Sequence, residues 1–195
     1  MSNNHASYAV RANERWLKQY YYIRAVFSVV WVAATLTVGQ QSFAIAALLL
    51  VIYPAWDAAA NVIDASRSGG LSANRSHAIN VSASSIMTLA VIIALTMNMN
   101  WVLGAFGLWA IFSGLLQLGT AIRRWKTSSG QWAMILSGGQ SALAGAVFIY
   151  QAQMPQQPSI STIAGYAGFG AFYFLVSALS LTLTLSRRKT GGAEI

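Results

Sequence analysis

The sequence has 195 residues, of which 56% are hydrophobic and only 8% charged, with a net charge of +8 at pH 7. Soluble domains contain about 25% charged residues, so this chain has too few charges for a soluble surface, and we predict a membrane protein. Its basic residues lie in short clusters between apolar runs, which argues against a nucleic-acid partner, and the absence of cysteine excludes disulfides and thiolate sites.

The chain begins with a polar stretch, which we expect to be cytoplasmic or interfacial. A short helix is expected from Asn13 onward, with Trp16 and Leu17 at the lipid interface, where aromatic side chains gather. A secretory signal peptide is disfavoured because Arg24 interrupts the start of the next apolar run and no clear polar mature domain follows. The predicted division is an N-terminal segment, a transmembrane domain and a cytoplasmic tail, at residues 1–19, 20–188 and 189–195.

Six segments of the sequence are long enough to cross a bilayer, which requires about 20 mostly apolar residues in a helix. A barrel is excluded because its strands would alternate polar and apolar residues, whereas these runs are continuously apolar. We therefore predict an all-α membrane protein with six transmembrane helices. The expected spans are Tyr20–Val38, Ser42–Ile63, Asn80–Met97, Trp101–Ile122, Trp132–Gln151 and Ser159–Leu185.

The connections between these spans predict the orientation. Three of them carry no charge, namely the turns at residues 39–41 and 98–100 and the loop at 153–159. All lysines and arginines lie on the opposite side, so the positive-inside rule places both termini in the cytoplasm. The chain then reads as three helical hairpins with the same in–out–in orientation, which are parallel repeats about an axis along the membrane normal.

Asp57 is the only carboxylate that the sequence places inside an apolar segment. A charge at the centre of a membrane helix costs roughly 2.5–3.5 kcal/mol on insertion scales, so its presence requires an explanation. On a helix, Tyr53, Asp57, Asn61 and Asp64 share one face because they are spaced by four, four and three residues. Pro54 is expected to free a backbone carbonyl one turn earlier and to kink the segment.

Two interpretations of this face remain open. In the first, its polar groups bond to neighbouring helices, and Asp57 pairs with Arg24 near the cytoplasmic end of the first span. In the second, Asp57 is a proton or cation site that opens to the cytoplasm. Proton relays usually need several ionisable groups in series, and Asp57 stands alone in its span, so we favour the structural interpretation.

Gln117 and Gln140 are the other large polar side chains within the predicted spans. Because both would be unfavourable in lipid, we expect them to point into the bundle and to hydrogen-bond there. A substrate cavity lined by Asp57, Gln117 and Gln140 is a further hypothesis. Small residues in the fourth, fifth and sixth predicted spans, where a spacing of four lets helix backbones approach, predict close packing: Gly104, Gly107 and Gly114; Ser137, Ser141 and Gly145; Ala164 and Gly168.

The sequence predicts no metal and no cofactor. Both histidines, His5 and His77, are expected in loops, so no span offers the paired histidines that a haem or an intramembrane metal requires. There is no glycine-rich phosphate loop followed by a lysine, so nucleotide hydrolysis is not supported. We therefore expect a protein without catalytic residues.

The fourth span and the basic residues after it carry a family resemblance. The stretch Phe112-Ser113-Gly114-Leu115-Leu116-Gln117-Leu118, followed by Arg123-Arg124-Trp125, resembles the HdeD-like membrane proteins, a bacterial acid-resistance family of three helical hairpins. The sequence departs from that pattern at Pro54 and Asp57 and in a long polar loop from Asp64 to His77. The resemblance implies an inner-membrane location and a stress role, and it carries over no catalytic residue.

The function expected from the sequence is a non-enzymatic inner-membrane protein of the HdeD-like type. It would act in stress or acid resistance or as a scaffold, with the lipid bilayer and protein partners or further copies of itself around it. The alternative is a small transporter or channel that uses Asp57 as its proton or cation site. The candidate functional polar residues for both are Asp57, Arg24, Asn61, Asp64, Gln117 and Gln140.

Overall fold

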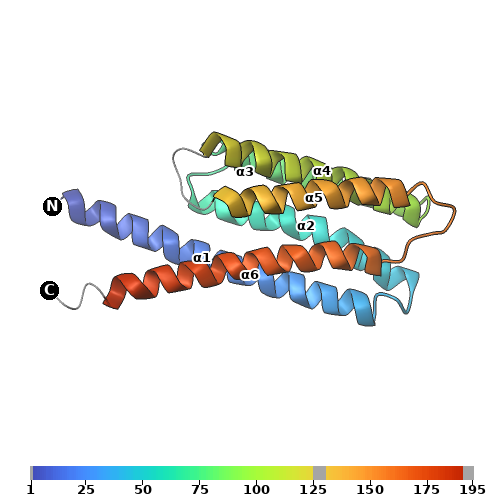
Figure 1. Cartoon of the computed structure of the whole chain (residues 1–195), viewed down its shortest axis with the longest axis horizontal. Coiled ribbons are helices and arrows are strands. Elements are labelled where there is room, and N and C mark those ends of the chain that lie inside the picture. The colour runs from blue at the N-terminus through green and yellow to red at the C-terminus, as the bar shows by residue number, and fades with distance from the viewer. Residues whose placement is uncertain (1, 125–130, 191–195) are drawn as a thin grey trace. The chain divides into compact units, whose positions relative to one another are not determined.

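The described part of the chain forms six helices, labelled α1 to α6 in Figure 1. The structure is a computed structural model that describes residues 2–124 and 131–190, with side chains at 14–119, 121–122 and 135–187. All six elements in these residues are α-helices, which confirms the predicted all-α class. Their bounds are α1 Ser2–Thr37, α2 Phe43–Arg67, α3 Arg75–Leu95, α4 Met99–Arg124, α5 Gln131–Gln151 and α6 Ser161–Thr190.

Five of these helices are long and apolar enough to cross a membrane, which makes the chain compatible with a multi-pass membrane protein. The spans lie in α1, α2, α3, α4 and α6. The sixth span, predicted at Trp132–Gln151, coincides with α5 but stays a prediction as a membrane crossing. The parallel hairpin repeats and the cytoplasmic position of both termini also stay predictions.

The first helix begins earlier than the sequence indicates. We expected a helix from Asn13 and a separate span from Tyr20, but α1 is continuous from Ser2 to Thr37. The boundary predicted at residues 19 and 20 therefore falls inside a helix. At the other end, α6 continues through Lys189 to Thr190, and the rest of the predicted tail lies outside the described residues.

The loop between α2 and α3 is shorter than predicted. We expected a polar loop from Asp64 to His77, but α2 continues to Arg67 and α3 begins at Arg75. The chain reverses at Gly69 and Gly70, whose φ angles of 93° and 89° favour glycine. Asp64 and His77 are therefore helical residues, and His5 also lies on a helix rather than in a loop.

Helix α2 has a defined start and passes through its proline without interruption. The Ser42 hydroxyl caps it by accepting a hydrogen bond of 3.2 Å from the backbone N–H of Ile45. Pro54 lies inside the helix and is fully buried. The helix continues for a further three turns, so the polar residues that follow Pro54 stay on one helical face.

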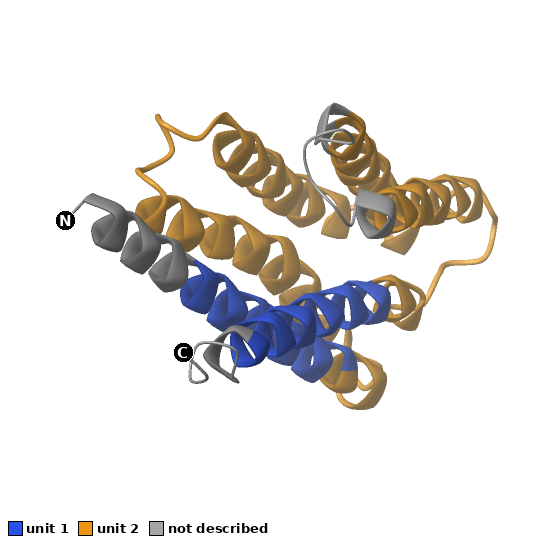
Figure 2. Cartoon of the chain, turned by 60° about the vertical axis from the view of Figure 1, so that its left-hand side comes forward, with its two compact units in different colours: residues 1–32, 167–195 blue, residues 33–166 orange. Residues whose placement is uncertain are grey.

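The chain divides into two compact units (Figure 2). Unit 1 comprises residues 1–32 and 167–195, and within it α1 packs on α6. The Tyr22 hydroxyl and Thr182 Oγ1 lie 3.2 Å apart, and the Arg24 guanidinium carbon lies 4.3 Å from the centre of the Phe174 ring. The cationic side chain of Arg24 is thus held partly by aromatic contact.

Unit 2 comprises residues 33–166, and in it α2 packs on α3, α3 on α4, and α4 on α5. The contact between α4 and α5, side by side in Figure 1, is the most extensive of the three. Its backbones touch at Gly107 and Gly145: a Cβ atom on Gly145 would lie 2.5 Å from the Gly107 carbonyl oxygen. A second close approach joins Gly114 to Gly138. The predicted small-residue packing is confirmed for Gly107, Gly114 and Gly145.

Candidate functional site

The polar residues predicted to share one face of α2 follow that helix toward its C-terminal end. Asn61 and Asp64 are buried, and Asp57 and Tyr53 are half-buried. Tyr53 packs edge-on against Trp109 of α4, with ring centroids 6.1 Å apart. The charged part of the face lies further along the helix, where α2 packs on α3.

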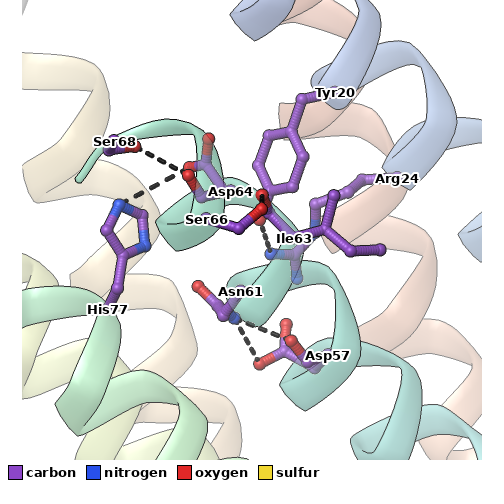
Figure 3. Close-up of polar contacts among 9 residues, drawn as sticks. All are labelled: Tyr20, Arg24, Asp57, Asn61, Ile63, Asp64, Ser66, Ser68 and His77. Atoms are coloured by element: carbon purple, nitrogen blue, oxygen red, sulfur yellow. Dashed lines mark hydrogen bonds and ion pairs between the residues drawn. The ribbon is translucent and has the colours of Figure 1, made fainter. Parts of the chain in front are cut away.

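The carboxylate of Asp57 accepts hydrogen bonds from Ser84 and Asn61. The Ser84 hydroxyl of α3 donates to Asp57 Oδ2 at 2.6 Å, and Asn61 Nδ2 donates to the same oxygen at 3.2 Å. Asn61 Nδ2 also donates to the backbone carbonyl of Asp57 at 2.8 Å (Figure 3). Ser84 is only 1% exposed, so this bond links the two helices in a dry environment, where hydrogen bonds to a charged group are strong.

Asp64 has a partner that the sequence analysis missed. Its Oδ2 lies 3.6 Å from Nε2 of His77, in the first turn of α3, and the two side chains are 10% and 19% exposed (Figure 3). The Nδ1 atom of the same imidazole is buried without a hydrogen-bond partner. The Ser68 hydroxyl donates to the backbone carbonyl of Asp64 at 2.7 Å, which fastens the end of α2.

These contacts align along one antiparallel seam. Asp57 and Asp64 lie seven residues apart on α2, and His77 and Ser84 lie seven residues apart on α3. Two helical turns therefore separate Asp57–Ser84 from Asp64–His77 on both helices. We call these four residues and Asn61 the α2–α3 seam. Within the described residues no group of three or more histidine, cysteine or acidic side chains could hold a metal ion.

Comparison with known proteins adds no relative. No protein-family model matches the chain, and no curated protein or solved structure is significantly similar to it. The HdeD-like resemblance stays a prediction, and Trp125 of its motif lies outside the described residues.

The remaining predicted site residues lie away from the seam or in the other unit. Gln140 on α5 is half-buried, but Gln117 on α4 is exposed, so the prediction that Gln117 points into the bundle is wrong. A Cβ atom on Gly138 of α5 would lie 3.1 Å from the Gln117 Cβ. Arg24 belongs to unit 1 and Asp57 to unit 2, so their pairing stays a prediction, as does the substrate cavity.

Ser141 makes a second polar link that sequence reasoning assigned only to packing. Its hydroxyl lies 3.0 Å from the carbonyl oxygen of Ala110 on α4 and 2.8 Å from the Tyr166 hydroxyl on α6. Because Tyr166 also packs on Phe148, with ring centroids 5.9 Å apart, α4, α5 and the start of α6 meet at one point. The spacing of Ser137, Ser141 and Gly145 was the signal for this contact.

Proposed function

We propose that the chain is a non-enzymatic, multi-pass protein of the bacterial inner membrane, similar in type to the HdeD-like proteins. Its role would be in stress or acid resistance or as a scaffold, with the lipid bilayer and protein partners or further copies around it. The supporting observation is the use of Asp57: its carboxylate accepts hydrogen bonds from Ser84 and Asn61. A half-buried polar group that is bonded to a neighbouring helix serves helix association.

The same pattern holds at two further polar positions of unit 2, Ser141 and Asn100. Ser141 bonds to the backbone of α4, and Asn100 Nδ2 donates to the carbonyls of Ala152 at 3.2 Å and Met154 at 2.8 Å. Buried or half-buried polar groups that bond across helices satisfy groups that lipid could not satisfy. This use of polar residues favours a structural role for them.

A second function, a small transporter or channel with Asp57 as its proton or cation site, is favoured by one observation. The sequence alone placed a single ionisable group in the span, whereas the structure aligns Asp57, Asp64 and His77 along one seam. Proton pathways in membranes use ionisable groups in series. The seam supplies such a series from the loop at residues 68–74 inward.

An Asp57→Asn variant distinguishes the two functions. If the role is structural, reconstituted vesicles at acidic pH show no proton flux above protein-free vesicles, and the variant unfolds at a lower temperature than the parent. If the role is transport, the parent conducts protons, and the variant folds as stably as the parent but loses the flux. A folded variant with unchanged flux and unchanged stability would contradict both functions.

The predicted pair of Asp57 with Arg24 is tested in the same assay. If the two charges pair, Asp57→Asn leaves Arg24 without its counter-charge, and Arg24→Gln in the same chain partly restores the lost stability. The thermal stabilities of the two single variants and the double variant form a double-mutant cycle. Additive losses would show that Asp57 and Arg24 act independently.

A further inference from the structure

We propose that Asp64 and His77 form a proton-dependent latch between the C-terminal end of α2 and the N-terminal end of α3. A proton bound by His77 turns the contact into an ion pair with Asp64, and loss of that proton releases it. The latch goes beyond the proposed function, because it requires neither ion movement at Asp57 nor a partner protein.

The position of the two side chains gives the latch its charge dependence. Nε2 of His77 lies 3.6 Å from Oδ2 of Asp64, so the two groups are within ion-pair distance. A carboxylate is ionised at neutral pH, whereas an imidazole changes its charge between about pH 5 and pH 8. The attraction is therefore that of two opposite charges at acidic pH and only that of a charge and a dipole at alkaline pH.

The second nitrogen of His77 provides the atom that binds the proton. In a neutral imidazole one nitrogen carries hydrogen and the other a lone pair. The carboxylate beside Nε2 favours the hydrogen there, which leaves the lone pair on Nδ1. Nδ1 is buried without a hydrogen-bond partner, so no existing bond must break when it takes up a proton.

The charged groups of α2 and α3 differ in their exposure and in their distance from His77. Asp64 and Asp57 of α2 lie along the seam, and the two arginines near it, Arg67 and Arg75, are exposed. Exposed charges are screened by salt and water, whereas Asp64 is 10% exposed and in direct contact. The described side chains of α4, which packs on α3, carry no charge.

The latch acts at the loop end of the α2–α3 hairpin. It joins the helix ends on either side of the loop at residues 68–74, where Gly69 and Gly70 provide the reversal. Two turns inward, the Ser84–Asp57 bond holds the helices without an imidazole. Acidification should therefore tighten the ends of α2 and α3 while leaving the inner bond in place.

The distance between the helix ends can be measured directly with spin labels. The chain has no cysteine, so Ser66→Cys and Ser76→Cys introduce the only two labelling sites, both at exposed positions. In lipid nanodiscs we expect a narrow distance distribution at pH 5 and a broader one shifted to longer distances at pH 8. With His77→Gln added, the two distributions should coincide, and a pH-dependent shift that persists would overturn the proposal.

Three further variants separate the latch from other titrating groups. His77→Lys carries a permanent positive charge, so its distance distribution should be narrow at both pH values. This variant also tests the latch if His77→Gln folds poorly. His5→Gln removes the other histidine of the sequence and should keep the parent's pH dependence. Asp57→Asn should keep it as well; if Asp57→Asn abolishes the shift, Asp57 is the titrating group and the latch is wrong.

Thermal unfolding gives an independent readout of the same contact. An ion pair present at acidic pH and lost at alkaline pH should raise the Tm of the parent over that of His77→Gln at pH 5 but not at pH 8. For a chain of this size the difference at pH 5 should be about 2–4 °C. An equal difference at both pH values would mean that His77 contributes packing only, which would overturn the latch.

Discussion

The hydrogen bond from Ser84 to Asp57, at 2.6 Å, joins α3 to α2, and its loss should be measurable. Ser84→Ala removes a hydroxyl that donates at 2.6 Å to the Asp57 carboxylate and leaves the Asn61 amide donating to the same oxygen. We expect a loss of about 1–2 kcal/mol in the free energy of unfolding, in the range for hydrogen bonds to charged groups. Reversible unfolding in mixed detergent micelles measures it.

The neighbouring serine provides the control for that variant. Ser85 lies on the same helix but is exposed, so Ser85→Ala should change the stability by less than about 0.5 kcal/mol. Ser84→Thr keeps the hydroxyl and should recover most of the loss. Equal effects of Ser84→Ala and Ser85→Ala would show that the bond to Asp57 contributes nothing to helix association.

Residue spacing predicted one side of the seam and missed the other. The four-four-three spacing correctly grouped Asp57, Asn61 and Asp64, because a single helix fixes which residues share a face. Their partners Ser84 and His77 depend on the antiparallel register of α2 and α3, and spacing within one helix does not contain that register. The prediction that Gln117 points into the bundle was wrong for a related reason. Polarity suggests burial in a membrane chain, but only packing decides which face of α4 contacts α5.

At the scale of helices, the contact between α4 and α5 depends on glycines that let the two backbones touch. A Cβ on Gly145 would lie 2.5 Å from the Gly107 carbonyl oxygen and 2.8 Å from the Ile111 nitrogen. Both neighbours are backbone atoms that cannot move aside without separating the helices. Gly145→Ala should therefore cost about 1–3 kcal/mol, and Gly145→Leu or Gly114→Leu should disturb assembly, as measured by unfolding and by detergent stability.

The control for this prediction lies on the same helix. A Cβ on Gly139 would meet no heavy atom of the described residues within 4 Å. Gly139→Ala should stabilise α5 by up to about 1 kcal/mol, because alanine has the higher helix propensity. A Gly145→Ala variant as stable as Gly139→Ala would show that α4 and α5 are not in backbone contact.

Hydropathy predicted the helices well and their ends poorly. The continuous apolar runs predicted the positions of all six helices. The polar residues at the start of α1 were predicted to form a separate N-terminal segment, and those at the end of α2 were predicted to form a loop. A helix extends wherever its backbone remains satisfied, and α2 continues to Arg67, shortly before Gly69 and Gly70, which adopt a positive φ. Polarity marks where a chain leaves lipid, which is a different boundary from the end of a helix.

At the scale of the whole molecule, the division into two units cuts across the hairpin repeats predicted from charge placement. Unit 1 combines parts of the first and last helices, and unit 2 contains α2 to α5 with the adjoining ends of α1 and α6. Charge placement treats each hairpin alike, but packing joins residues far apart in the sequence, as Tyr22 and Thr182 show. The predicted repeat therefore concerns the orientation of the helices in the membrane, and its test must measure that orientation.

Reporter fusions test the predicted orientation of all six helices in the membrane. Because the basic clusters lie on one side of the predicted spans, fusions after Arg67, Arg124 and Arg188 should be cytoplasmic under the positive-inside rule. Fusions at the uncharged connections, at Gln40, Asn98 and Gln156, should be external.

A fluorescent protein that folds only in the cytoplasm and a phosphatase that is active only outside it give opposite signals at each site, so poor expression cannot be mistaken for orientation. The pair at Arg124 and Gln156 decides whether α5 crosses the membrane, and the same signal at both would remove the sixth span. One basic cluster on the external side would overturn the arrangement of both termini in the cytoplasm.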